Sequence, residues 1–153
     1  MSSSSVRRDQ APEIDLVLDP AKPRAILEFA LERNSVLAAI RSSENLVEDP
    51  CDAHPYLLKA ANFHGELTTR ECPVCETQPL VELRYVYGKE LGPYSGRIKS
   101  KFELDQMAYR HGNLKVFVVE VCTGCSWNYL IRSYAIGDGR ARKPLRRSRD
   151  WLD

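Results

Sequence analysis

Two pairs of cysteines constrain the fold of this chain more than any other feature of its sequence. In each pair two residues separate the cysteines: Cys72 and Cys75 in "ECPVCETQPL", and Cys122 and Cys125 in "VEVCTGCSWNYLIRSY". One such turn can offer two thiolates to a metal ion, and two turns supply the four ligands of a tetrahedral site. The chain between the pairs must therefore run out and back so that the two turns meet.

Three segments next to the cysteines have the alternating pattern and the β-branched and aromatic content of strands. They are residues 80–87, 115–121 and 128–136. The first predicted strand leaves the first cysteine pair, the second returns to the second pair, and the third leaves it. This arrangement is typical of a zinc ribbon.

The two cysteine pairs are 46 residues apart, more than the spacing of about 15–20 residues that is usual in zinc ribbons. An insertion at residues 88–113 accounts for the excess. It begins as a glycine-rich loop and ends in a predicted short helix, with Ser100 as its cap and Gly112 as its terminator.

Helices are predicted in the N-terminal half. From Pro20 to Ile40 apolar residues recur at helical spacing, and Asp19 is suited to cap this helix. A second helix is predicted in "CDAHPYLLKAANFHG", with Asp52 as its cap and Gly65 as its stop. We therefore expect an α+β fold, in which N-terminal helices pack on a three-stranded antiparallel zinc-ribbon-like sheet with an inserted loop and short helix.

The predicted organisation has four parts. They are a disordered N-terminus at 1–18, a helical part at 19–66, a zinc-ribbon-like part at 67–137 that contains the insertion, and a basic C-terminal tail at 138–153. The first part is predicted to be disordered because it has four serines, scattered charge and few aromatic residues.

A structural zinc ion is the favoured occupant of the cysteine pairs. The predicted metal ligands are Cys72, Cys75, Cys122 and Cys125. A closed tetrathiolate site has no open position for water, so its role would be to stabilise the fold rather than to catalyse a reaction. Iron in a rubredoxin-like site is the next interpretation, and it is disfavoured because Glu76 and Ser126 stand where glycine commonly follows the second cysteine.

Two further interpretations of the cysteines remain open. A thiol redox centre would require one reactive pair at a helix N-terminus, but strands are predicted after both pairs. Four packed, free cysteines are the other alternative. A second metal site at Cys51, His54 and His64 would need a fourth ligand, which is not evident, so these residues are interpreted as packing or capping groups.

The charge of the chain is unevenly distributed. Residues 140–149, "RARKPLRRSR", contain six basic residues and no acid, while the rest of the chain has 16 basic and 21 acidic residues. The residues predicted to bind an anionic partner are Arg140, Arg142, Lys143, Arg146, Arg147 and Arg149. A solvated tail that only aids solubility is the alternative. Three tyrosines in "YVYGKELGPYSGR" could stack on bases or pack back onto the sheet.

No catalytic constellation is evident: the sequence has no phosphate-binding loop, metalloprotease motif or ordered catalytic triad. No apolar run approaches the length of a membrane span, and the N-terminus lacks the apolar core of a secretory signal. We therefore expect a cytoplasmic protein, where a reducing environment favours metal binding over disulfides.

Four segments resemble a family of small uncharacterised actinobacterial proteins, catalogued as a domain of unknown function. They are "CDAHPYLLKAANFHGE", "CPVC", "YVYGKELGPYSGR" and "VEVCTGCSWNYLIRSY", and the resemblance spans roughly residues 20–136. It implies a bacterial cytoplasmic protein with the paired cysteine motif and no assigned activity.

The sequence favours a non-enzymatic zinc-binding module that binds nucleic acid or the transcription and translation machinery. This expectation rests on analogy with other small zinc ribbons and on the basic tail. A thiol redox or other metal-dependent enzyme, or a scaffold with protein partners only, is the alternative.

Overall fold

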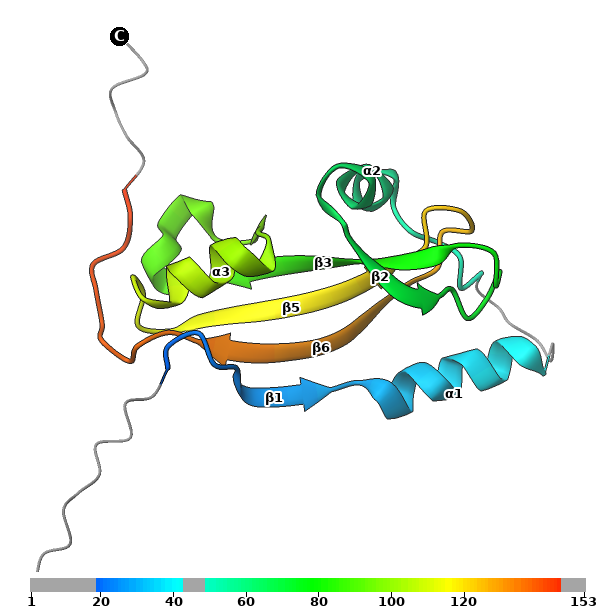
Figure 1. Ribbon diagram of the computed structural model, residues 1–153, viewed down its shortest axis with the longest axis horizontal. Coiled ribbons are helices and arrows are strands. Elements are labelled where there is room, and N and C mark those ends of the chain that lie inside the picture. The colour runs from blue at the N-terminus through cyan, green and yellow to red at the C-terminus, as the bar shows by residue number, and fades with distance from the viewer. Residues whose placement is uncertain (1–18, 43–48, 147–153) are drawn as a thin grey trace, which may run out of the picture.

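The computed structural model describes residues 19–42 and 49–146 (Figure 1). The predicted disordered N-terminus and the end of the basic tail, including Arg147 and Arg149, lie outside the described residues. Within these two ranges, six strands form one antiparallel sheet in the order β1-β6-β5-β3-β2, with the short β4 paired to β3. The α+β class is confirmed, and the prediction of a three-stranded sheet is wrong.

The three predicted strands form the centre of this sheet. They are β3 (Pro79–Tyr87), β5 (Leu114–Val121) and β6 (Asn128–Ile136). The strands that the sequence pattern did not predict are β1 (Arg24–Glu28), β2 (Glu66–Glu71) and β4 (Arg97–Ile98). They lie outside the centre and carry more exposed residues, so the alternation that marks a half-buried strand is weak in them.

Helices cover both faces of the sheet. The α-helices are α1 (Ala30–Arg41), α2 (Pro55–His64) and α3 (Lys101–Ala108), and the 3-10 helix η1 spans Lys89–Tyr94. Because side chains alternate along a strand, Leu114, Val116 and Val118 of β5 face one side of the sheet. On that side they pack against η1 and α3, whereas α2 packs against Val119 and Val121 on the opposite side.

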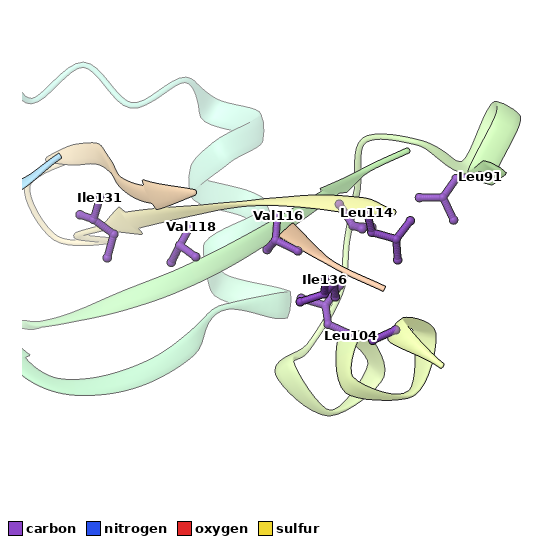
Figure 2. Close-up of a cluster of buried hydrophobic side chains, with 9 residues drawn as sticks. Leu91, Leu104, Leu114, Val116, Val118, Ile131 and Ile136 are labelled. Carbon is purple, nitrogen blue, oxygen red and sulfur yellow. The ribbon is translucent and has the colours of Figure 1, made fainter. Parts of the chain in front are cut away.

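The main core lies between the sheet and the inserted segment. Leu91 of η1 and Leu104 of α3 pack with three side chains of β5 and with two of β6, Ile131 and Ile136 (Figure 2). All seven are 7% exposed or less, so the predicted insertion is part of the core of the fold rather than an appendage.

The long helix predicted from Pro20 is wrong in its first part. Residues 24–28 form β1, which pairs with β6, and α1 begins only after Phe29, whose N–H donates to the carbonyl of Ile131 at 3.0 Å. A short apolar run fits either a helix or a strand, and here the backbone of β6 supplies the hydrogen-bond partners that favour a strand.

The other helix predictions hold with two corrections. One is the end of α3, which stops at Ala108 with Tyr109 as its C-cap, before the predicted terminator Gly112. Ser100 caps α3 in a capping box with Glu103, as predicted for this helix. Gly65 ends α2, as predicted. The N-cap of α2 is His54 rather than the predicted Asp52, because Nδ1 of His54 accepts a hydrogen bond from the N–H of Tyr56 at 3.1 Å. Asp52 instead accepts a hydrogen bond from the side chain of Asn128.

The sheet has two chemically different ends. Both cysteine turns lie at one end, because β3 begins where β5 ends and Val81 pairs with Val121. At the other end lie η1, α3 and the segment that follows β6 (Figure 1). Among the described residues, no helix is long and apolar enough to span a membrane.

Candidate metal centre

The four predicted ligands come together at one end of the sheet. The Sγ atoms of Cys72, Cys75, Cys122 and Cys125 all lie within 4.8 Å of one another. Two of the cross-pair distances, Cys72 to Cys125 and Cys75 to Cys122, are 3.6 Å each. Four sulfurs at about 2.3 Å from a tetrahedral zinc ion would be separated by about 3.8 Å. The cluster could therefore hold a metal ion with little rearrangement.

Each cysteine pair forms a turn between two antiparallel strands. The first turn joins β2 to β3, and the N–H of Cys72 donates to the carbonyl of Gln78 at 2.8 Å. The second joins β5 to β6, and the N–H of Cys122 donates to the carbonyl of Trp127, also at 2.8 Å. The strands thus hold the first cysteine of each pair in hydrogen-bonded backbone, which fixes where its sulfur lies.

The residue after each second cysteine has a left-handed backbone. Glu76 has a φ of 55° and Ser126 a φ of 70°, and each donates its N–H at 3.0 Å to the carbonyl of the first cysteine in its turn. Glycine adopts this conformation most easily, which explains why it is common at this position. The two side chains that depart from the usual pattern therefore stand at strained positions.

Burial divides the four sulfurs into two classes. Cys72 and Cys122 are buried, while Cys75 and Cys125 are partly exposed. In the metal-free chain, burial raises the pKa of the Cys72 and Cys125 thiols to about 12. The hydroxyl and the backbone N–H of Thr77 lower the pKa of the Cys75 thiol to about 6. Cys75 is therefore the first of these three groups to ionise as pH rises.

An apolar layer from α1 covers the cysteine cluster. Leu37, together with the partly buried Val36 and Ile40, packs against the buried cysteines and Trp127. Trp127 is 1% exposed, and its ring stacks on Tyr129 with a centroid separation of 5.8 Å. This tryptophan therefore packs over the cluster rather than on the surface.

A buried carboxylate contacts Trp127, which packs against the cluster. Glu120 of β5 is fully buried and forms ion pairs with Arg33 of α1 and with Arg70 of β2, the latter at 2.9 Å. Arg132 of β6 pairs with Glu28 of β1. The arginines near the cluster are therefore engaged with carboxylates, and Glu120 ties α1, β2 and β5 together.

The remaining candidate ligands do not form a second site. Cys51 packs beside the cluster, and burial raises the pKa of its thiol. His54 caps α2, and His64 lies in the last turn of the same helix. Within the part of the chain that the structure describes, only the four paired cysteines form a group suited to bind a metal.

The predicted anion-binding residues lie at the other end of the sheet. Arg140, Arg142, Lys143 and Arg146 are exposed in an extended segment, residues 137–146, which we call the C-terminal strap. Two backbone hydrogen bonds to Glu90 hold the strap. The N–H of Arg142 donates to the carboxylate Oε1 of Glu90 at 2.7 Å, and the N–H of Leu145 donates to the backbone carbonyl of Glu90 at 2.8 Å. This docking was not apparent from the sequence, in which Glu90 is one charged residue of a loop.

Comparison with known proteins places the chain among proteins of unknown function. The sequence profile of a family of unknown function (DUF5318) matches residues 21–150. The uncharacterized protein Rv0049 of Mycobacterium tuberculosis is 42% identical over 122 residues, which cover 80% of this chain and 89% of the relative. The uncharacterized protein Mb0050 of Mycobacterium bovis has the same identity and coverage. No solved structure matches the chain.

Proposed function

The chain belongs to the DUF5318 family, whose function is unknown, and we propose that it is a non-enzymatic module stabilised by a zinc ion. The module binds nucleic acid through the end of the sheet opposite the cysteines, which is formed by residues 88–115 and 137–146 and which we call the basic end. The nucleic acid could be free or part of a transcription or translation complex. The observation that carries the proposal is the separation of a closed cysteine cluster from a basic surface at opposite ends of one sheet.

Zinc is the proposed metal because the ligand set is four thiolates. Soft thiolates favour zinc or iron, and tetrahedral zinc sites with four cysteines are structural. A metal with four protein ligands has no position left for a substrate or a water molecule. Such an ion would join the β2–β3 turn to the β5–β6 turn and so contribute folding energy to this end of the sheet.

The distribution of charge supports an anionic partner at the other end. Residues 88–115 and 137–146 together contain ten lysines and arginines and four aspartates and glutamates. The rest of the described chain contains eight basic and ten acidic residues. A basic surface of this kind attracts the phosphates of nucleic acid from solution, and the slightly acidic rest of the described chain does not.

A thiol redox enzyme is the second candidate, and the lowered pKa of Cys75 favours it. A redox pair of the thioredoxin type lies at a helix N-terminus. Here both pairs lie in turns between strands, and the four sulfurs converge instead of leaving one pair exposed. The convergence favours the metal site over the redox pair.

The test is a salt titration of nucleic-acid binding, followed by the anisotropy of a fluorescein-labelled oligonucleotide. The test variant carries Arg140→Gln, Lys143→Gln and Arg146→Gln, which are exposed strap residues. The control carries Arg41→Gln, Lys59→Gln and Arg132→Gln, which lie away from the strap, are at least partly exposed and change the charge equally. We expect the test variant to bind more weakly and its log–log salt slope to fall by roughly 0.7–0.9 for each phosphate that it no longer neutralises.

Two results would overturn the nucleic-acid proposal. The first is that the full-length protein with its metal does not bind at low salt. The second is that the control variant binds as weakly as the test variant, because binding would then follow net charge alone.

A further inference from the structure

The sheet face that carries α2 has two adjoining cavities beside the basic end. The first, of about 770 Å³, lies between the strap and the end of β3, and its lining includes Lys89 and Arg142. The second, of about 760 Å³, lies on the sheet beside Leu57 of α2. Tyr87 and Lys115 line both cavities, so the two adjoin at these side chains, and we call them together the groove.

Aromatic rings form the floor of this groove. Tyr85 pairs with Phe117 and Tyr87 with Lys115 across β3 and β5, so all four side chains lie on the same face of the sheet. Tyr87 and Phe117 meet edge to face with ring centroids 5.4 Å apart, and Tyr87 is 44% exposed. The groove therefore presents aromatic surface to solvent on two neighbouring central strands.

Cations flank the aromatic rings. The Nζ of Lys115 lies 5.2 Å from the ring centroid of Phe117, and Lys89 lines the strap side of the groove. Within the described residues, neither lysine has a carboxylate within ion-pair distance. The one acid that lines the groove, Glu90, has both carboxylate oxygens engaged by the N–H groups of Gly112 and Arg142. The lining of the groove carries more positive than negative charge, because the two lysines and Arg142 outnumber Glu90.

We propose that this groove binds single-stranded nucleic acid, with bases stacked on Tyr87 and Phe117 and phosphates held by Lys89 and Lys115. Unpaired bases offer faces to aromatic side chains, while the bases of a duplex are stacked on one another and turn only their edges to a protein. An apolar peptide would use the rings but leave both lysines without a counter-charge. This inference rests on the proposed nucleic-acid binding and specifies its form and its site.

The test compares three fluorescein-labelled probes of about twelve nucleotides: oligouridine, oligodeoxythymidine, and a DNA duplex of equal length. The test variants are Tyr87→Leu, Phe117→Leu and Lys115→Gln in the metal-loaded full-length protein. The controls are Phe102→Leu, because Phe102 is 70% exposed on α3 and lines neither cavity, and Lys59→Gln on α2. Circular dichroism and thermal unfolding establish that each variant is folded.

The wild-type protein should bind both single strands at least tenfold more tightly than the duplex. Each aromatic variant should bind the single strands about tenfold or more weakly, because it removes the ring on which a base stacks. The controls should bind as the wild type does. A preference of oligouridine over oligodeoxythymidine would identify RNA as the ligand, and the reverse preference DNA.

Other outcomes separate this inference from the proposed function. If the protein binds the duplex as well as the single strands, or if the aromatic variants bind as the controls do, the groove inference is wrong while nucleic-acid binding stands. If no probe binds at low salt, both are wrong. A variant that fails to fold is replaced by Tyr87→Phe and Phe117→Tyr, which keep an aromatic ring and should keep the affinity, whereas Lys115→Gln should still reduce it.

Discussion

The indole N–H of Trp127 donates a hydrogen bond to Oε1 of Glu120 at 3.1 Å, and both side chains are almost completely buried. Through this contact the layer over the cysteine cluster is connected to the ion pairs that Glu120 makes with Arg33 and Arg70. The cysteine end of the sheet and the docking of α1 therefore share one buried carboxylate.

Replacing Glu120 with glutamine should strongly destabilise the protein. The substitution removes the counter-charge of Arg33, whose side chain is only 19% exposed, and breaking such a buried pair costs about 3 kcal/mol or more. Urea unfolding measures the effect. Glu28→Gln is the control, because the Glu28–Arg132 pair is exposed and should contribute less than about 1 kcal/mol. Equal destabilisation by the two substitutions would contradict a stabilising role for the buried network.

Metal removal should destabilise the cysteine end of the sheet. We expect about one zinc ion per chain by elemental analysis, and we expect a strong chelator to lower the unfolding temperature. Cys122→Ser should abolish binding and destabilise strongly, whereas Cys51→Ser should retain the metal because Cys51 is outside the cluster of four. Absence of any metal from freshly purified, reduced protein would refute the zinc site.

Alkylation at different pH values should distinguish a structural metal site from a redox pair. In the metal-loaded protein we expect all four ligands to react slowly, since their thiolates are bound. In freshly stripped protein Cys75 should react first, at a rate that rises with pH through its pKa of about 6. Cys72 and Cys125, with pKa values of about 12, should lag far behind at neutral pH. Rapid labelling of the metal-loaded protein, measured by mass spectrometry of its peptides, would favour redox chemistry.

Substituting glycine for Ser126 should stabilise the protein slightly. A side chain at a φ of 70° costs about 1–2 kcal/mol, and the greater freedom of glycine in the unfolded chain offsets part of the gain, which leaves about 0.5 kcal/mol. The same substitution at Ser35, inside α1, should instead destabilise by about 0.5 kcal/mol. Thermal unfolding of both variants measures the difference, and a lower stability for Ser126→Gly would show that the turn is not strained.

Glu90→Gln should release the strap without unfolding the sheet. The two carboxylate oxygens of Glu90 accept hydrogen bonds from the N–H groups of Gly112 and Arg142. In glutamine an NH2 group replaces one of these oxygens, so it would face one of the two N–H groups and could not accept its hydrogen bond. We expect faster hydrogen exchange at Arg142 and Leu145 and a destabilisation of about 1.5–3 kcal/mol. Glu32→Gln, at an exposed position of α1, is the control. Unchanged exchange in the strap would show that Glu90 does not hold it.

The same interaction should depend on pH. Burial raises the pKa of Glu90, but the hydrogen bonds from Gly112 and Arg142 outweigh it, so the pKa lies below its ordinary value of 4.5. A carboxyl with a lowered pKa in the folded state stabilises that state above the unfolded pKa, and the contribution disappears as the pH falls through the folded value. Protection of the strap should therefore persist at pH 5 and disappear only in stronger acid.

Neighbouring residues alone were enough to predict the two cysteine turns and the strands at the centre of the sheet. The spacing within each cysteine pair is a local property of a turn, and the alternation in 80–87, 115–121 and 128–136 is a local property of a half-buried strand. Both can therefore be recognised in a linear sequence. The capping box of α3 is local as well, because Ser100 and Glu103 bond to each other's backbone.

Long-range contacts fix which segments complete the sheet and where the charges face. Residues 24–28 have a helical pattern, but β6 offers them backbone partners, and such hydrogen bonds are not encoded in local periodicity. The strap depends on Glu90, which lies 52 positions from Arg142 in sequence and accepts its N–H. The groove depends on Tyr87 and Lys115, which are neighbours only because β3 and β5 pair in one particular register. Contacts of this kind form when distant segments bury apolar surface together, and so the fold as a whole determines them.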